Sequence, residues 1–168
     1  NESTGTAAGT ATVNLNDGII SGTTYAGVDS SGILNVYGTS SITGNLTLAR
    51  DSGSNGTLNI AEDATFSITG TWYDGSGNAV INNQGTLRLE NKSLYISQSS
   101  GGEILNNLAG GTIAKTGTGA STIAWDVVNN GALNVAGGTL TITNGYSGDG
   151  TATVAGNSIL NLTGTLTA

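Results

Sequence analysis

The sequence contains no cysteine, histidine, proline or methionine, and only 9% of its 168 residues are charged. Without cysteine the chain can form neither a disulfide nor a thiolate metal site. Without histidine it can form neither a Ser-His-Asp triad nor an ordinary zinc site. Aromatic residues make up 5% of the chain and include a single Phe, too little bulk to fill the wide centre of a conventional globular core. The composition suits a narrow core, to which each layer contributes a few aliphatic side chains.

Basic residues are also scarce, with four Lys and Arg against eleven Asp and Glu, and the net charge is −7. Binding to nucleic acid requires clustered Lys and Arg, and so does attraction to anionic membrane surfaces. No apolar run approaches the ~20 residues of a transmembrane helix. We therefore expect no nucleic-acid partner and no membrane insertion.

Glycine, by contrast, is abundant, with 28 residues, and 36% of the chain is hydrophobic. Disorder is the first alternative for a polar, glycine-rich chain. The aliphatic residues argue against it because they alternate regularly with polar ones, and the proline that disordered linkers usually carry is absent. The chain is therefore expected to be ordered.

A short phrase recurs along the chain: a turn of Asn, Ser or Gly, a small residue, and then an apolar–polar–apolar triplet. In the first clear copy, Leu34 and Val36 fall on one face of an extended strand and Asn35 on the other. The copies therefore predict β-strands. They are SSGILNV (30–36), SNGTLNI (54–60), NNQGTLRL (82–89), NNGALNV (129–135) and GNSILNL (156–162), with weaker versions in GTATVNL (9–15) and AGGTIAK (109–115).

Further alternating segments lie between the copies and predict a second and a third strand in each repeat. The second strands are 44–48, 64–68, 93–97, 138–142 and 164–168, and the third are 78–82, 103–107, 125–130 and 151–157. The phrase begins near residues 10, 32, 56, 85, 111, 131 and 157. This spacing fits three strands of ~5 residues and three turns.

These features predict an all-β fold, a parallel β-helix (β-solenoid) with about three short strands per rung and six to seven rungs, in one domain over 1–168. Rungs would stack ~4.8 Å apart through backbone hydrogen bonds. The alternative is an antiparallel β-sandwich or jelly roll. The recurring phrase favours the solenoid, because sandwich strands have no reason to resemble one another at a fixed period.

Two details of the solenoid are also predicted. Paired asparagines at turns should form amide ladders along the rod; the pairs are Asn82/Asn83, Asn106/Asn107 and Asn129/Asn130. Lys115 falls on the same strand face as Ile113, so the register of 111–118 is expected to bend outward.

The phrases NNQGTLRL, NNGALNV and GTLTITNG resemble the repeats of bacterial autotransporter passengers and filamentous-haemagglutinin-type adhesins, over roughly residues 10–168. The resemblance implies a right-handed β-helix displayed outside a Gram-negative-type cell, working as an adhesin, stalk or matrix component. The sequence departs from the family in having no transporter barrel and no protease or lipase motif. The resemblance therefore transfers no functional residue.

Carboxylates are the remaining catalytic option, in a glycosidase-like pair. The candidates share no repeat phase and have few cations nearby, so turn carboxylates, no catalytic residue and no enzyme are expected; they are Glu62, Asp63, Asp74, Glu90, Glu103, Asp126 and Asp149. The segment from Asp74 to Asn78 resembles part of a calcium loop but lacks its other acidic positions. A tight turn is expected there, with no metal and no cofactor.

The segment 70–77 is the longest insertion between predicted strands and forms the candidate binding loop, with Trp72, Tyr73 and Asp74. Exposed aromatic residues beside a carboxylate can stack on sugar rings or anchor a protein partner. The alternative is that Trp72 folds back to cover a rung. Tyr146, in a second glycine-rich loop, has the same two interpretations. Threonine triplets at 139–143 and 163–167 raise ice binding as a lower alternative, although most rungs lack the paired threonines that it requires.

The ends of the predicted solenoid carry no polar or amphipathic cap. An open end exposes apolar side chains and unpaired backbone groups, which promotes association. The candidate assembly end consists of Ile159, Leu160, Leu162 and Leu166. We therefore expect a secreted or cell-surface structural or adhesive protein that assembles end to end with copies of itself. The alternative is a passenger fragment that binds surface glycan, or a host or matrix protein, through 70–77.

Overall fold

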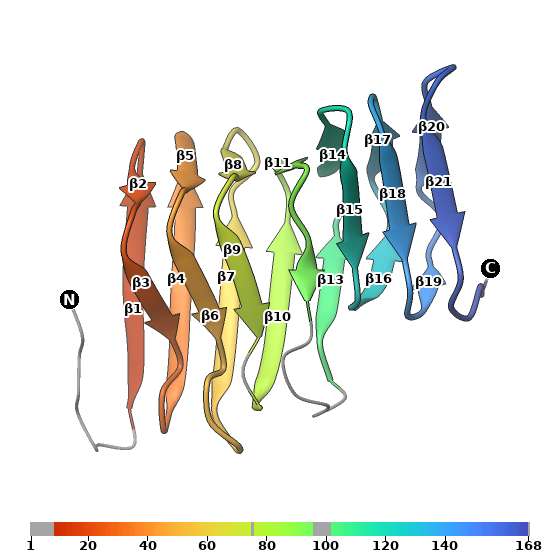
Figure 1. Cartoon of the computed structure of the whole chain (residues 1–168). Coiled ribbons are helices and arrows are strands. Elements are labelled where there is room, and N and C mark those ends of the chain that lie inside the picture. Colours follow the sequence, from red (N-terminus) through yellow and green to blue (C-terminus); the bar gives the residue numbers. More distant parts are fainter. Residues whose placement is uncertain (1–8, 75, 96–101, 168) are drawn as a thin grey trace.

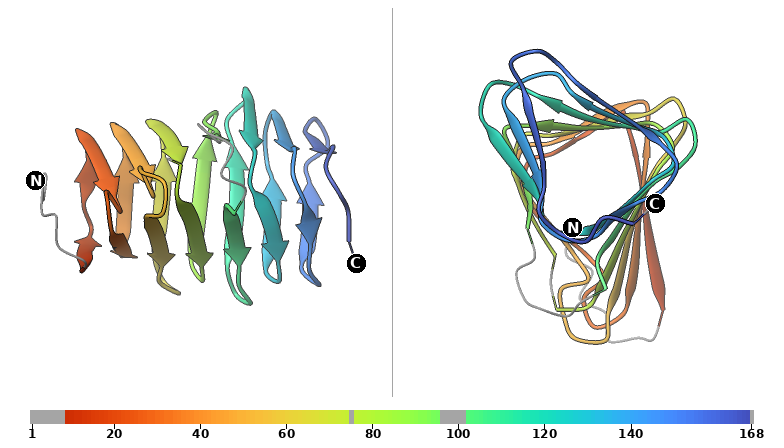
Figure 2. Two further views of the ribbon diagram at one scale, coloured as in Figure 1. Left: turned by 90° about the horizontal axis from the view of Figure 1, so that it is seen from below. Right: turned by 90° about the vertical axis from the view of Figure 1, so that its right-hand side faces the viewer.

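The structure, a computed structural model, describes residues 9–74, 76–95 and 102–167 and contains three parallel β-sheets, called sheets A, B and C (Figure 1). Each sheet has seven strands, and the chain visits A, B and C in turn. One visit to all three sheets makes one rung. Viewed along the rod axis, the rungs form a three-sided tube (Figure 2).

Sheet A consists of β1 (Thr10–Asn16), β4 (Ser31–Tyr37), β7 (Asn55–Ile60), β10 (Asn78–Asn83), β13 (Ile104–Asn107), β16 (Asp126–Asn129) and β19 (Tyr146–Ser147). Sheet B consists of β2 (Ile19–Ile20), β5 (Thr39–Ile42), β8 (Thr65–Ile68), β11 (Thr86–Glu90), β14 (Thr112–Thr116), β17 (Ala132–Val135) and β20 (Thr151–Val154). Sheet C consists of β3 (Thr23–Ala26), β6 (Asn45–Leu48), β9 (Thr71–Asp74), β12 (Leu94–Tyr95), β15 (Ala120–Ile123), β18 (Thr139–Ile142) and β21 (Ile159–Leu162).

The predicted fold class is confirmed: three strands per rung, seven rungs, and parallel pairing throughout the three sheets. An antiparallel sandwich is excluded by this pairing. At ~4.8 Å per rung the strands make a rod about 30 Å long.

The recurring phrase, however, does not mark one position in the rung. Its copies at 30–36 and 54–60 form strands of sheet A, whereas those at 82–89 and 129–135 form strands of sheet B and the last forms β21 of sheet C. The expectation that each copy is the first strand of a repeat, at the same position in every rung, was therefore wrong. The phrase reflects the chemistry of a corner followed by a strand, which all three corners of a rung share.

The core consists of columns, that is, residues at the same register position in successive strands. In sheet A one inward column runs from Val13 through Leu34, Leu58, Ile81, Leu105 and Val127 to Tyr146. The middle members are fully or almost fully buried, whereas Val13 at the first rung is 59% exposed. Alternation of apolar and polar residues along each strand thus becomes a continuous aliphatic interior along the rod.

The three largest aromatic side chains of the core form one cluster. Trp72 contacts Phe66 and Trp125 edge to face, with ring centroids 6.3 Å and 6.2 Å away. All three rings are fully buried.

Two amide ladders run along sheet A. On its outer face Asn14, Asn35, Asn59, Asn82 and Asn106 are joined by side-chain hydrogen bonds of 2.9–3.0 Å, each donated toward the N-terminal rung. On its inner face Asn83 donates to Asn107 and Asn107 to Asn129, both at 2.7 Å, and Asn129 donates to the Tyr146 hydroxyl at 2.9 Å. The predicted ladders are confirmed for these asparagines.

The register near Lys115 does not bend outward, and that expectation was wrong. Lys115 pairs with Leu89 and Val135 in sheet B, and its side chain is fully buried. Nζ donates to the side-chain oxygen of Asn91 at 3.2 Å and to the backbone carbonyls of Thr116, Gly117 and Gly137 at 2.5, 2.9 and 3.1 Å. The strand stays regular because the long side chain runs along the core and reaches the corner carbonyls.

Candidate functional site

The carboxylates considered for catalysis, where the structure describes their side chains, accept local hydrogen bonds, form a surface ion pair or lie exposed at corners. Asp126 accepts a hydrogen bond from the Gly145 amide at 2.8 Å, and Glu90 lies 3.7 Å from Arg88 on the surface. Glu103 is buried and accepts a hydrogen bond from the Gly102 amide at 3.1 Å. Glu62, Asp63 and Asp149 are exposed. Within the residues that the structure describes, no three Asp or Glu gather as a metal site would require.

The candidate binding loop 70–77 is in large part a strand. Thr71–Asp74 form β9, in which Trp72 pairs with Leu46 on one side and Leu94 on the other. Trp72 is fully buried, so the expectation that it stacks on a ligand in an exposed loop was wrong. The alternative, in which Trp72 packs over a rung, agrees with this burial. Tyr73 and Asp74 are described by their backbone register alone, and Gly75 lies outside the described residues.

The second candidate aromatic residue also belongs to the interior. Tyr146 lies in β19, half-buried against the core, and its hydroxyl accepts the last hydrogen bond of the inner ladder. Alternation within the surrounding sequence is too short to reveal this strand of two residues.

Two exposed tyrosines, Tyr25 and Tyr95, lie on sheet C, where no binding residue was predicted. Tyr25, Thr47, Tyr73 and Tyr95 occupy one register column. Tyr25 and Tyr95 are 37% and 48% exposed, and the guanidinium of Arg50 lies 4.7 Å from the centroid of the Tyr25 ring. Alternation indicates that Tyr25 and Tyr95 face outward, but only the register shows that they share a column.

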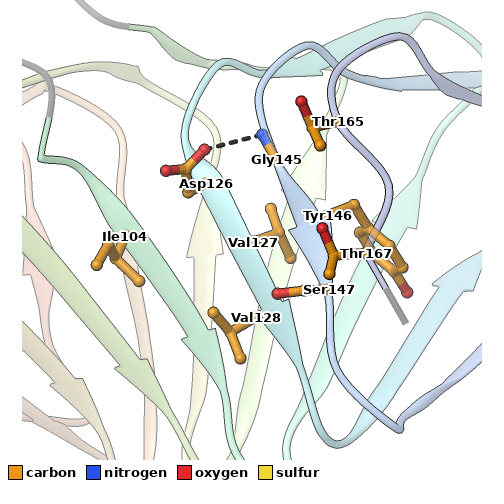
Figure 3. Close-up of a pocket in the computed structure, with 9 residues that line it drawn as sticks. All are labelled: Ile104, Asp126, Val127, Val128, Gly145, Tyr146, Ser147, Thr165 and Thr167. Atoms are coloured by element: carbon orange, nitrogen blue, oxygen red, sulfur yellow. Dashed lines mark hydrogen bonds between the residues drawn. The ribbon is translucent and has the colours of Figure 1, made fainter.

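A shallow hollow of about 380 Å³ lies on the outer side of sheet A at its C-terminal end (Figure 3). Its wall combines the aliphatic side chains of Ile104 and Val128 with the hydroxyl groups of Ser147, Thr165 and Thr167. Asp126 at the rim is already bonded to Gly145, as the dashed line in Figure 3 shows. The hollow thus offers hydroxyl groups and aliphatic surface, with the exposed carboxylate of Asp126 at its rim.

The two terminal rungs leave inward-facing apolar residues open to solvent. At the C-terminal end Val154, Leu162 and Leu166 continue the inward columns and are 42%, 37% and 67% exposed. Leu160 also faces inward and is half-buried, whereas Ile159 faces outward and is 53% exposed. The predicted assembly end therefore divides into inward and outward residues.

The outward threonine pair of β18 in sheet C is not repeated in the two strands that flank it. Thr139 and Thr141 of β18 lie between Ala120 and Thr122 of one neighbouring strand and Ile159 and Asn161 of the other. A flat ice-binding array requires threonine at both positions on successive rungs, and this register does not supply it over the described part of sheet C.

Comparisons of this chain with protein-family models, with curated proteins and with solved structures give no match. In the described ranges there is no helix that is long and apolar enough to span a membrane.

Proposed function

We propose that this chain is a non-enzymatic structural segment of a secreted or cell-surface rod, and that its terminal rungs stack end to end on copies of itself. The observation that carries the proposal is the exposure of inward apolar side chains at both ends. Val13 at the N-terminal rung is 59% exposed, although its equivalents in the middle of the rod are buried.

Stacking of one rod on another would bury these side chains and pair the free edges of the terminal strands. Strands β1, β2 and β3 form one edge of the three sheets, and β20 and β21 form the opposite edge of two of them. Each free edge presents unpaired backbone N–H and C=O groups, which favour pairing with another strand. Burial of apolar area at ~25 cal/mol per Å² would add to this pairing.

The resemblance to autotransporter passengers and filamentous-haemagglutinin-type repeats supports the same proposal, since rods of that kind work outside bacterial cells. The low charge supports a displayed rod of stacked rungs, because the outward positions carry mostly Asn, Thr and Ser.

Negative-stain electron microscopy of the undenatured protein across a concentration series tests the proposal. We expect fibres that lengthen with concentration, and we expect Leu162→Asp to abolish them because it places a charge on the inward end face. Asn161→Asp is the matched control, since Asn161 is exposed and outward in the same strand. Short separate rods at every concentration, or equal effects of the two substitutions, would contradict end-to-end assembly.

Binding of a surface glycan is the second candidate function, and we propose sheet C as its site in place of the loop 70–77. The exposed rings of Tyr25 and Tyr95 support it, since aromatic faces stack on sugar rings. Glycan-array binding that survives Leu162→Asp but is lost in Tyr95→Ala would favour this function; Tyr37→Ala, which removes an exposed tyrosine of sheet A, is the control.

A further inference from the structure

The outer side of sheet A carries the longest strands of the rod. Its strands β1 and β4 have seven residues each and β7 and β10 have six, whereas the strands of sheets B and C have five or fewer. We call the outward residues of β1, β4, β7, β10 and β13 the sheet-A face. Its two central columns are Thr12–Ile33–Thr57–Val80–Ile104 and Asn14–Asn35–Asn59–Asn82–Asn106.

No member of the sheet-A face is charged. The remaining outward residues of these strands are Thr10, Asn16, Ser31, Tyr37, Asn55 and Asn78. Acidic residues lie instead at the corners that flank the face, with Asp17 and Glu62 on one side and Asp29 on the other, all exposed. With a net charge of −7, two copies repel each other least where these uncharged surfaces meet.

The face is complementary to itself in hydrogen bonding. Each asparagine within the ladder uses one N–H to donate to the next amide and one oxygen lone pair to accept. An amide has two N–H donors and two acceptor sites, so each side chain retains one donor and one acceptor outside the ladder. A surface that offers equal numbers of both matches a second copy of itself.

The column beside the ladder supplies the apolar part of such a contact. Ile33, Thr57, Val80 and Ile104 are half-buried β-branched residues, which pack in well-defined rotamers on a pleated surface. The two columns repeat at the same spacing of ~4.8 Å in any second copy. Ladders of amides beside interdigitated side chains are the elements of tightly packed sheet-to-sheet interfaces.

The dimensions set the strength of the contact. Five strands of seven, seven, six, six and four residues, at ~3.3 Å per residue and ~4.8 Å between strands, give a face of about 500 Å². Stable complexes bury about 800 Å² per partner, so two single rods should associate weakly and reversibly.

From these observations we propose that the sheet-A face is a lateral interface, through which two copies of this chain pair side by side. This pairing is separate from stacking at the rod ends, because it uses outward residues on the side of the tube and none of the inward apolar residues exposed at the ends. Rods joined at their ends would pair more tightly, because several such contacts would form at once, but the contact itself requires only two single rods.

A single engineered cysteine tests the interface, because the chain has no cysteine of its own. Thr57 lies on the third of the five rungs, so in face-to-face pairing it lies close to its own equivalent, whether the rods run parallel or antiparallel. We expect Thr57→Cys to form disulfide-linked dimers severalfold faster than Thr65→Cys under mild oxidation. Thr65 is the matched control, an outward, half-buried threonine of the same rung on sheet B. Equal rates at the two positions would overturn the proposal.

Sedimentation velocity gives a second measurement that needs no cysteine, with Leu162→Asp present throughout to remove end contacts. We expect the weight-average sedimentation coefficient to rise with protein concentration, and to rise more at higher salt, which screens the acidic corners. Val80→Lys should remove the rise, whereas Ser67→Lys on sheet B should leave it unchanged. A sedimentation coefficient independent of concentration, or the same loss of the rise in both lysine variants, would contradict lateral pairing. Neither result would bear on end-to-end stacking, which the electron microscopy tests separately.

Discussion

The indole rings of Trp72 and Trp125 meet edge to face inside the tube, with their centroids 6.2 Å apart. Trp72 belongs to β9 on the third rung, and Trp125 directly precedes β16 of the sixth rung. One aromatic contact therefore ties together rungs that share no strand pair. In a solenoid, where each rung otherwise contacts its immediate neighbours, such a contact couples the stability of distant rungs.

Trp72→Ala should lower the free energy of unfolding by about 3–5 kcal/mol, because it opens a large cavity in a packed core. Trp72→Phe should cost less, because it keeps an aromatic ring beside Phe66 and loses an indole N–H that has no hydrogen-bond partner among the described residues. Urea unfolding followed by circular dichroism measures both. Tyr95→Ala removes an exposed aromatic side chain and should change stability little; a similar loss from Tyr95→Ala and Trp72→Ala would contradict the assignment of Trp72 to the core.

Asn107→Ala should be far more destabilising than Asn59→Ala, although both remove a middle member of an amide ladder on sheet A. Asn107 is fully buried and bonds to Asn83, Asn129 and two carbonyls. Removal of its side chain leaves these buried polar groups without a hydrogen-bond partner, at a cost of about 2–4 kcal/mol. Asn59 lies on the outer face, where water replaces the lost partners, and its loss should cost about 1 kcal/mol or less. Thermal unfolding of the two variants in parallel gives the comparison, and equal shifts in Tm would refute the role of burial.

Burial away from water lowers the pKa of Lys115 below its ordinary value of 10.5. The unfolded chain then binds more protons than the folded one between the lowered pKa and 10.5, so the contribution of Lys115 to stability rises with pH across that window. The free energy of unfolding of the wild type minus that of Lys115→Met should increase from neutral pH toward pH 10.5. Urea titrations of both proteins at several pH values measure the difference, in which the other titrating groups cancel. A difference that falls with pH would show that the carbonyls around Nζ stabilise the ammonium more than burial penalises it.

Gly56→Ala should destabilise the rod by about 1–3 kcal/mol through overpacking. A Cβ at Gly56 would lie 2.4 Å from the amide nitrogen of Ala49 and 2.7 Å from the carbonyl oxygen of Ala26. Gly22→Ala is the matched control, because a Cβ there meets nothing within 4 Å, and it should be neutral or slightly stabilising. Chemical unfolding distinguishes the two, and tolerance of alanine at both positions would show that the corner beside Gly56 relaxes.

Strand class and face assignment were predictable from the sequence because both depend on local alternation. Leu34 and Val36 are buried and Asn35 faces outward, as the period of two requires. The sheet to which a strand belongs was not predictable in the same way. The copies of the phrase at 54–60 and 82–89 look alike, yet the first pairs within sheet A and the second within sheet B, because rung length varies and the corner chemistry repeats three times per rung.

The candidate sites were less predictable than the fold, since they depend on register and not on alternation. The sequence left the position of Trp72 open because β9 and its glycine-rich flanks resemble a loop, and only pairing with Leu46 and Leu94 places it inside. Lys115 contradicted the expected pattern because the sequence does not reveal the carbonyls that receive its ammonium group. The outward or inward position of residues at the end, such as Ile159 and Leu162, follows from alternation and was available from the start.

The parallel pairing of successive rungs also fixes how the molecule would respond to force. Every backbone ladder connects one rung to the next, so its hydrogen bonds point along the rod axis, and a pull on the two termini opens them a few at a time instead of shearing a whole strand at once. Asn35 and Asn59 occupy equivalent places on neighbouring rungs and are 24 residues apart, so the release of one rung would lengthen the chain by about 80 Å. A rod about 30 Å long would therefore lengthen in steps under load, one rung at a time, and could rewind when the load is removed.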